Sequence, residues 1–289
     1  MKDLTTVEIY LTIQAPVATV FEALTTSESL AAWFSEFADV SPANNRYDFW
    51  GRFTPEAPGQ SQGYHALRTF NPNQALAFDW RVRQAETAVQ FQLEPQGAET
   101  KLLLRHQGVP ATKTSDYTFS DFWAFSLENL RGWLEGQTIG ARCDFSTVQR
   151  DNQVRLDVDI EAGRDAVFEA LIRPKALERY IATQATVDPQ VGGSYSYGWA
   201  EGGPVKILDL VPEQRLSFSW TYPNEPETIV TWSLEGSGSK THLTLVHSGF
   251  APNRSNGDYQ AGWLKYVHRL KFLVEVGASW RKPETASSD

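Results

Sequence analysis

The sequence predicts an α+β protein built from two tandem copies of one domain, each an antiparallel sheet covered by a long C-terminal helix. Three observations predict this. The chain of 289 residues repeats itself at a spacing of about 147 residues. Each copy contains segments in which apolar and polar residues alternate, as in half-buried strands. Each copy ends in a stretch whose apolar residues recur every three or four positions, as on one face of a helix. A sheet with one apolar face must be covered, and this helix is the available cover.

The repeat is clearest near the start of each copy, where residues 7–40 align on residues 154–187 without gaps and 11 of 34 positions are identical. The shift later falls to 140, because the first copy carries an extra polar, Pro- and Gly-rich segment around residues 55–62, which we interpret as a longer loop. The period is too long for a solenoid repeat, so each copy is a full domain. The predicted divisions are residues 1–136 (first copy), 137–152 (linker), 153–281 (second copy) and 282–289 (disordered tail).

The elements of each copy follow in one order. Residues 7–13 alternate as a strand, and Pro16 then stands where the first turn of a helix tolerates proline. A second short helix follows, and then several strands. Short turn sequences at residues 95–98 and 236–239 predict hairpins, and hence an antiparallel sheet. The long helix closes the copy.

Composition excludes several classes of function. Lys and Arg total 26 against 35 Asp and Glu, a net charge of −9, so the chain lacks the excess of cations that nucleic acid or anionic lipid requires. No apolar run is long enough to span a membrane, and the N-terminus lacks the apolar segment of a secretory signal. The single cysteine, Cys143, fits a reducing compartment. We expect a soluble cytoplasmic protein that binds neither nucleic acid nor membrane.

Short motifs recur at matching places in the two copies. They are Pro16 with residues 20–24 (Val-Phe-Glu-Ala-Leu, repeated at 167–171), Trp33-Phe34 (Tyr180-Ile181 in the second copy), Gly192-Gly193-Ser194-Tyr195 (Asn44-Asn45-Arg46-Tyr47 in the first), the Thr-x-Leu-x-Leu-x-His-x-Gly strands at 100–108 and 241–249, and Gly262-Trp263. In this order and spacing they resemble the SRPBCC (START-like, helix-grip) superfamily. More narrowly, they resemble the family named for the activator of the heat shock protein 90 ATPase, and the likeness covers nearly the whole chain.

The resemblance implies a curved antiparallel sheet wrapped around the C-terminal helix, with two short helices after the first strand and an apolar cavity between sheet and long helix. In relatives that cavity holds lipids, hormones or polyketides, or is closed, so the fold does not decide the use. Our leading hypothesis is non-catalytic binding of a small apolar or aromatic ligand in the cavity. The alternatives are a regulator of the chaperone heat shock protein 90 and an enzyme of the cyclase or aromatase type.

Two histidines are the most informative titratable groups. Strand alternation points His106 and His247 inward, where a buried imidazole needs a hydrogen-bond partner. Each is either a structural group or a polar anchor for a ligand at the mouth of the cavity. A third interpretation is a catalytic base, with Tyr195 or Tyr197 beside His247. His242 and His247 fall on opposite faces of one strand, so no metal site is expected there.

Aromatic residues are numerous on the faces that should converge between sheet and helix. They form either plain core or a pocket lining that stacks a flat ligand. The second copy has the denser set, so we expect it to be the ligand-competent domain. The candidate ligand-binding residues are Tyr195, Tyr197, Trp199, Trp220, Trp232, His247 and Trp263 in the second copy and Trp80, His106 and Trp123 in the first. No catalytic residue, metal ligand or cofactor is assigned, and the oligomeric state is left open.

Overall fold

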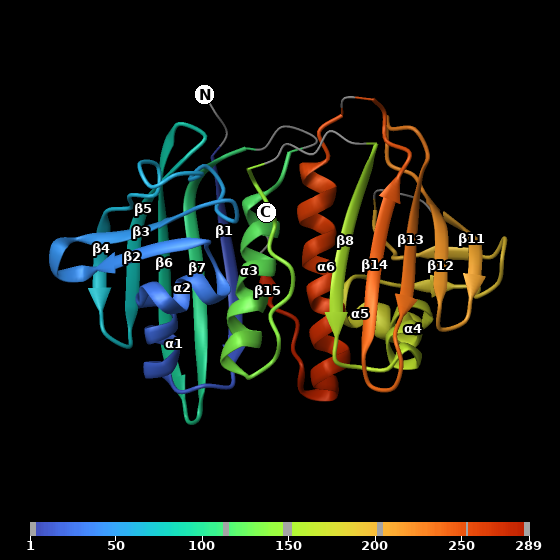
Figure 1. Cartoon of the computed structure of the whole chain (residues 1–289), viewed down its shortest axis with the longest axis horizontal. Coiled ribbons are helices and arrows are strands. Elements are labelled where there is room, and N and C mark those ends of the chain that lie inside the picture. Colours follow the sequence, from blue (N-terminus) through green and yellow to red (C-terminus); the bar gives the residue numbers. More distant parts are fainter. Residues whose placement is uncertain (1–3, 112–115, 147–151, 201–204, 253, 286–289) are drawn as a thin grey trace. The chain divides into compact units, whose positions relative to one another are not determined.

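The computed structural model describes residues 4–111, 116–146, 152–200, 205–252 and 254–285. They form two compact units (Figure 1). Unit 1 contains most of residues 1–148 together with the residues from Pro283 onward, and unit 2 contains residues 149–282. Each unit is an α+β domain with an antiparallel sheet and a long helix against it, which confirms the predicted tandem fold. Among the described residues, no helix combines the length and the apolar character needed to cross a membrane.

Unit 1 follows the predicted order of strand, two short helices, further strands and a long helix. Its helices are α1 (Val17–Thr25), α2 (Ser27–Trp33) and α3 (Phe119–Leu134), with a 3₁₀ turn at Pro42–Asn44. Its strands are β1 (Leu4–Ile13), β2 (Phe37–Ser41), β3 (Arg46–Trp50), β4 (Leu67–Asn71), β5 (Ala75–Val82), β6 (Ala85–Gln96), β7 (Glu99–Pro110) and β15 (Glu284–Thr285). The main sheet has the order β15-β1-β7-β6-β5-β4, and β2 pairs with β3 in a separate hairpin.

Unit 2 repeats this order. Its helices are α4 (Arg164–Ile172), α5 (Pro174–Tyr180) and α6 (Gly257–Val276), with a 3₁₀ turn at Gly277–Ser279. Its strands are β8 (Gln153–Ile160), β9 (Thr186–Val187), β10 (Ser194–Ser196), β11 (Val205–Val211), β12 (Arg215–Trp220), β13 (Thr228–Glu235) and β14 (Thr241–Ser248). They form one sheet in the order β8-β14-β13-β12-β11-β10-β9.

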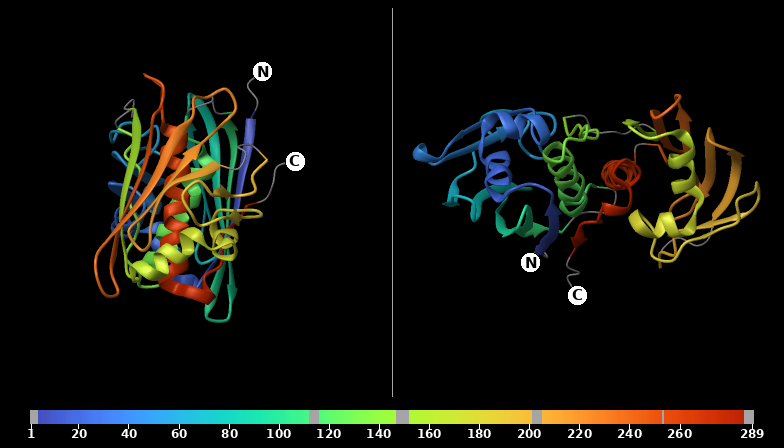
Figure 2. Two further views of the ribbon diagram at one scale, coloured as in Figure 1. Left: turned by 90° about the vertical axis from the view of Figure 1, so that its right-hand side faces the viewer. Right: turned by 90° about the horizontal axis from the view of Figure 1, so that it is seen from below.

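Strand alternation places one face of each sheet against its long helix. In β5, Leu76, Phe78 and Trp80 are buried, whereas Arg81 on the other face is exposed. The same inward row continues on the neighbouring strands, so that sheet and helix enclose the core between them. Figure 2 shows the strands of each unit curving around one side of its long helix.

The turns agree with their residue types. The predicted hairpin at residues 95–98 joins β6 to β7, and that at 236–239 joins β13 to β14. The turn before β3 places Asn45 at φ 54°, and the equivalent turn of unit 2 places Gly192 at φ 84°. Asparagine and glycine tolerate this left-handed region better than most residues. The two positions are not equivalent, because Asn45 aligns with Gly193, so the left-handed residue lies one position later in unit 1.

The structure describes part of the segment that follows each long helix. Of the predicted linker, residues 137–146 are described and pack on unit 1. There the Gly140 N–H donates to Asn129 Oδ1 over 2.8 Å. Arg142 donates to the main-chain oxygen of Ala31 in α2 and to that of Ser35, just after the helix. Within the range predicted as a disordered tail, β15 pairs antiparallel with β1. Residues 147–151 and 286–289 lie outside the described residues.

Candidate functional site

Each unit contains a line of hydrogen bonds that ties its long helix to its sheet. In unit 1, Trp123 of α3 donates its indole N–H to Nδ1 of His106 on β7 over 3.0 Å. Nε2 of His106 lies 2.7 Å from the hydroxyl of Thr87 on β6. That hydroxyl donates to the main-chain oxygen of Trp80 on β5 over 2.6 Å. The line therefore joins the helix to three adjacent strands.

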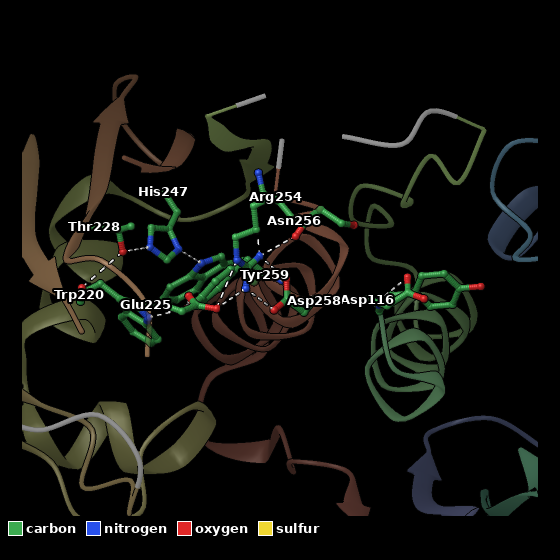
Figure 3. Close-up of polar contacts among 12 residues, drawn as sticks. Asp116, Trp220, Glu225, Thr228, His247, Arg254, Asn256, Asp258 and Tyr259 are labelled. Carbon is green, nitrogen blue, oxygen red and sulfur yellow. Dashed lines mark hydrogen bonds and ion pairs between the residues drawn. The ribbon is translucent and has the colours of Figure 1, made fainter. Parts of the chain in front are cut away.

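Unit 2 builds the same line from the matching residues (Figure 3). Trp263 of α6 donates to Nδ1 of His247 over 3.0 Å, and Nε2 of His247 lies 2.7 Å from the hydroxyl of Thr228. The Thr228 hydroxyl in turn lies 3.4 Å from the main-chain oxygen of Trp220. We call the two lines the Trp–His–Thr relays.

The relay threonines are functional residues that the sequence reasoning did not single out. A signal was present, because the dipeptide Glu86-Thr87 recurs as Glu227-Thr228 immediately before the aligned strands. An identical polar dipeptide beside an inward histidine indicates a partner for the imidazole.

The relays determine the protonation of both imidazoles. An indole N–H can only donate, so the Nδ1 atom that receives it carries no proton, and the ring proton is on Nε2, which donates to the threonine. Burial lowers the pKa of His106 to about 3, and burial, with the nearby charge of Arg254, lowers the pKa of His247 to about 3. Both rings are neutral at pH 7, and both nitrogens of each are occupied within the domain. The arrangement connects helix to sheet and leaves neither nitrogen for a ligand.

A second polar cluster lies at the N-terminal end of α6 (Figure 3). Arg254, just before the helix, pairs with Glu225 over 2.6 Å and with Asp258 over 2.8 Å. The hydroxyl of Tyr259 donates to Glu225 over 2.9 Å and accepts the indole N–H of Trp220 over 3.2 Å. The cluster fastens the loop between β12 and β13 to the start of α6. Burial opposes the charge on Arg254, but hydrogen bonds and charge from Asp258 and Glu225 outweigh it and raise the pKa, so the guanidinium stays charged.

The aromatic residues of unit 2 form an inner and an outer set. The inner set is buried and consists of Tyr195, Tyr197, Trp232 and Trp263. The outer set is half-buried and consists of Trp199, Trp220, Tyr259 and Tyr266, which we call the aromatic rim. The ring of Trp199 lies 5.9 Å from that of Trp220, 5.6 Å from that of Tyr266 and 4.9 Å from that of Tyr197. The rim thus lies directly against the inner set.

The structure brings together the predicted residues of the second copy. Ring contacts link Tyr195 to Tyr197 and Tyr197 to Trp220, and Trp263 contacts Trp220, Trp232 and His247. All seven candidates therefore belong to one connected aromatic group of unit 2, which includes both inner residues and rim residues.

The corresponding group of unit 1 is closed to solvent. The positions that match the rim carry Gly51, Trp80, Phe119 and Ser126. Trp80 is 1% exposed and Phe119 is 2% exposed. Trp80 stacks flat on His106 with ring centres 5.6 Å apart, and it meets Trp123 edge-on at 5.9 Å. The three candidates of the first copy are therefore packed on one another as core.

The extra segment of the first copy closes unit 1 further. Residues 55–62 form a loop, as their composition predicts, but Ala57 within the loop and Thr54 and His65 beside it are buried. The His65 ring lies 3.9 Å from that of Phe49 and 5.7 Å from that of Trp80. His65, just after this loop, thus contacts Trp80, whose counterpart in unit 2 is Trp220 of the aromatic rim.

Cys143 and the side chains that could bind a metal were the other candidates for reactive groups. Cys143 is buried, and burial raises the pKa of its thiol, which disfavours the reactive thiolate. Across the described ranges, no group of three or more His, Cys, Asp or Glu side chains is placed to hold a metal ion.

The fold of each unit, a curved antiparallel sheet against a long C-terminal helix, defines a protein of two tandem helix-grip domains, the class called SRPBCC or START-like. The model of the family described as Activator of Hsp90 ATPase homolog 1-like protein matches residues 14–135 and 161–275, one segment in each copy. The chain belongs to this family. A search of curated proteins gives no match.

Solved structures resemble the chain at low identity. Protein MLL2253 from Mesorhizobium loti is 23% identical over 43% of this chain and 98% of its own, with a TM-score of 0.40. CalU16 from Micromonospora echinospora is 23% identical over 42% of this chain and 75% of its own, with a TM-score of 0.39. DynU16, a protein of the dynemicin biosynthetic locus, is 18% identical over 93% of this chain and 98% of its own, with a TM-score of 0.37.

Proposed function

We propose that unit 2 binds a small apolar or aromatic molecule between its sheet and α6, without converting it chemically. The observation that carries the proposal is the aromatic rim, because half-buried indole and phenol rings that keep some contact with solvent lie against a buried aromatic interior. In unit 1 the matching positions are small or fully covered.

Aromatic surface at a rim favours a flat partner for a physical reason. Leaving large rings in contact with water is unfavourable, and a ligand that covers them recovers part of this free energy. Ring pairs add about 0.5–1.5 kcal/mol each beyond the area buried. Trp and Tyr also lose little conformational entropy on binding, because each has only two side-chain torsions.

The contacts favour binding over catalysis. A cyclase-type enzyme needs a positioned acid or base with a free proton site. His247, the candidate from the sequence, uses both nitrogens in its relay. The carboxylates of Glu225 and Asp258 are paired with Arg254. These groups stabilise the domain and hold the loop beside the rim.

The proposal is tested with N-phenyl-1-naphthylamine, an uncharged probe whose fluorescence rises in apolar sites. We expect saturable binding that Trp199→Ala weakens roughly fivefold, the equivalent of one lost ring contact. Trp199→Phe keeps a ring and should retain most of the affinity. Trp133→Ala, at an exposed tryptophan of unit 1, is the matched control and should bind like the unaltered protein. No saturable binding, or equal loss in the control, would refute the proposal.

A further inference from the structure

Three tyrosine hydroxyls are buried together beneath the aromatic rim. Tyr180 ends α5, Tyr195 lies on β10, and Tyr197 follows directly after that strand. The rings of Tyr195 and Tyr197 are 5.3 Å apart, and Tyr197 also contacts Trp199 and Trp220 of the rim. Of the three phenols, Tyr197 is therefore the one next to the rim.

Only one of the three hydroxyls has a structural task. Tyr195 donates to the main-chain oxygen of Leu171 over 2.7 Å. Tyr180 and Tyr197 are 1% and 6% exposed. Within the part of the chain that the structure describes, neither hydroxyl makes a hydrogen bond of normal geometry, and the Tyr197 hydroxyl interacts only loosely with the phenol of Tyr195. A buried hydroxyl without a partner is costly, so two in one place need an explanation.

The matching positions of unit 1 carry side chains that leave no phenol hydroxyl without a hydrogen bond. Tyr47 matches Tyr195 and makes the same bond, to Leu24, over 2.7 Å. Phe49 stands at the position of Tyr197 and has no hydroxyl. Trp33 stands at the position of Tyr180, and its indole N–H donates a hydrogen bond to the main-chain oxygen of Ala23 over 3.0 Å. The free phenols thus occur in the unit that has the rim.

We propose that the hydroxyls of Tyr180 and Tyr197 bind an oxygen atom of the ligand, so that unit 2 takes an aromatic molecule bearing a carbonyl or hydroxyl group. This inference rests on the proposed binding function and specifies the class of ligand.

The protonation of the phenols agrees with this role. Burial raises the pKa of Tyr180, Tyr195 and Tyr197 well above the usual value. A neighbouring phenol raises each pKa further, and for Tyr197 the interaction with Tyr195 offsets part of this increase. The phenols therefore remain protonated and act as donors. Buried donors favour a ligand group that only accepts hydrogen bonds, because a ligand O–H would itself need an acceptor in the apolar site. A ketone oxygen is the simplest such group.

The experiment compares two flat ligands of nearly the same shape, 2-acetylnaphthalene and 2-isopropenylnaphthalene, which differ by a carbonyl oxygen in place of a methylene group. Affinities for the full chain are measured by calorimetry, and the ketone-to-alkene affinity ratio is compared between proteins. We expect Tyr197→Phe to lower this ratio roughly tenfold, and Tyr180→Phe to lower it in the same direction. Comparing ratios cancels the different solubilities of the two ligands.

Tyr195→Phe is the matched control, because the Tyr195 hydroxyl already donates a hydrogen bond to the main-chain oxygen of Leu171. It should lower the urea midpoint and leave the ratio unchanged. Tyr197→Phe should leave the midpoint unchanged or raise it, since Phe49 occupies this place in unit 1. If both ligands bind and the ratio is the same in all variants, the phenols do not bind ligand oxygen and the inference fails. If neither ligand binds, the proposed function itself fails.

Discussion

Replacing Thr87 with valine tests the relay of unit 1. Valine has nearly the shape of threonine and lacks only the hydroxyl. The change removes the acceptor of the His106 Nε2–H and the donor to the main-chain oxygen of Trp80. Thr87 is 3% exposed and His106 is fully buried, so water cannot replace these bonds without rearrangement.

A change of tautomer in His106 cannot compensate for the lost hydrogen bond to the Thr87 hydroxyl. If His106 carried the proton on Nδ1, that proton would face the indole N–H of Trp123 across 3.0 Å, two donors against each other. One buried donor therefore stays unpaired in either form. An unpaired donor costs about 1–3 kcal/mol and the second lost bond about 1 kcal/mol. We expect Thr87→Val to lower the free energy of unfolding by about 3 kcal/mol.

The assay is urea unfolding followed by tryptophan fluorescence, with Thr87→Ser as the matched variant. Serine keeps the hydroxyl and loses one buried methyl group, so it should cost about 1 kcal/mol. Thr228→Val makes the same change in unit 2 and should behave like Thr87→Val. Equal effects of valine and serine, or a cost of valine below about 0.5 kcal/mol, would refute the relay as a stabilising connection.

Three further predictions concern titration and the polar cluster. Because the folded pKa of His106 and of His247 is about 3, against 6.5 in the unfolded chain, their contribution to stability is complete above pH 6.5 and falls as the pH drops toward 3. The loss at pH 5 is about 2 kcal/mol for each ring. Arg254→Met leaves two partly buried carboxylates facing each other and should cost about 2 kcal/mol. Tyr259→Phe removes the acceptor of the Trp220 indole and should cost about 1 kcal/mol.

Each of these has a direct readout. Ring nitrogen shifts in NMR spectra should show both relay imidazoles neutral, with the proton on Nε2, at pH 5; a charged ring at that pH would contradict the assignment. Urea unfolding measures the other two variants. An Arg254→Met protein as stable as the parent would mean that the cluster does not hold the loop. Trp80, the counterpart of Trp220 in unit 1, has a buried indole N–H that makes no hydrogen bond to the described residues of that unit. An unpaired indole N–H is therefore tolerated at this position, and a loss above about 3 kcal/mol for Tyr259→Phe would contradict the prediction.

Most of the fold was predictable from the sequence. Strand alternation identified the inward faces, including those of His106 and His247, because side-chain direction in a strand depends only on parity. The repeat supplied an internal check, since an element seen in one copy was required in the other. The turn at Asn45 was predictable from the chemistry of positive φ.

The site was less predictable, for reasons that concern particular residues. Glu225 and Arg254 lie on different loops, and only the folded chain brings them together. The extra loop of the first copy is polar in composition, but its few apolar and aromatic groups fold inward, as His65 shows. In the sequence, Tyr180 is only a departure from the Trp-Phe motif of the first copy. The structure shows that tyrosine in place of tryptophan leaves a buried hydroxyl without a hydrogen bond to the described residues.

The most direct test of the whole account is a crystal structure of the full chain soaked with 2-acetylnaphthalene. We expect one molecule in unit 2, its ring against Trp199 and Trp220 and its oxygen within hydrogen-bond distance of the Tyr197 hydroxyl, with none in the interior of unit 1. A molecule bound inside unit 1, or an interior of unit 2 left unoccupied at saturating ligand, would contradict the division into a closed domain and a ligand-binding domain.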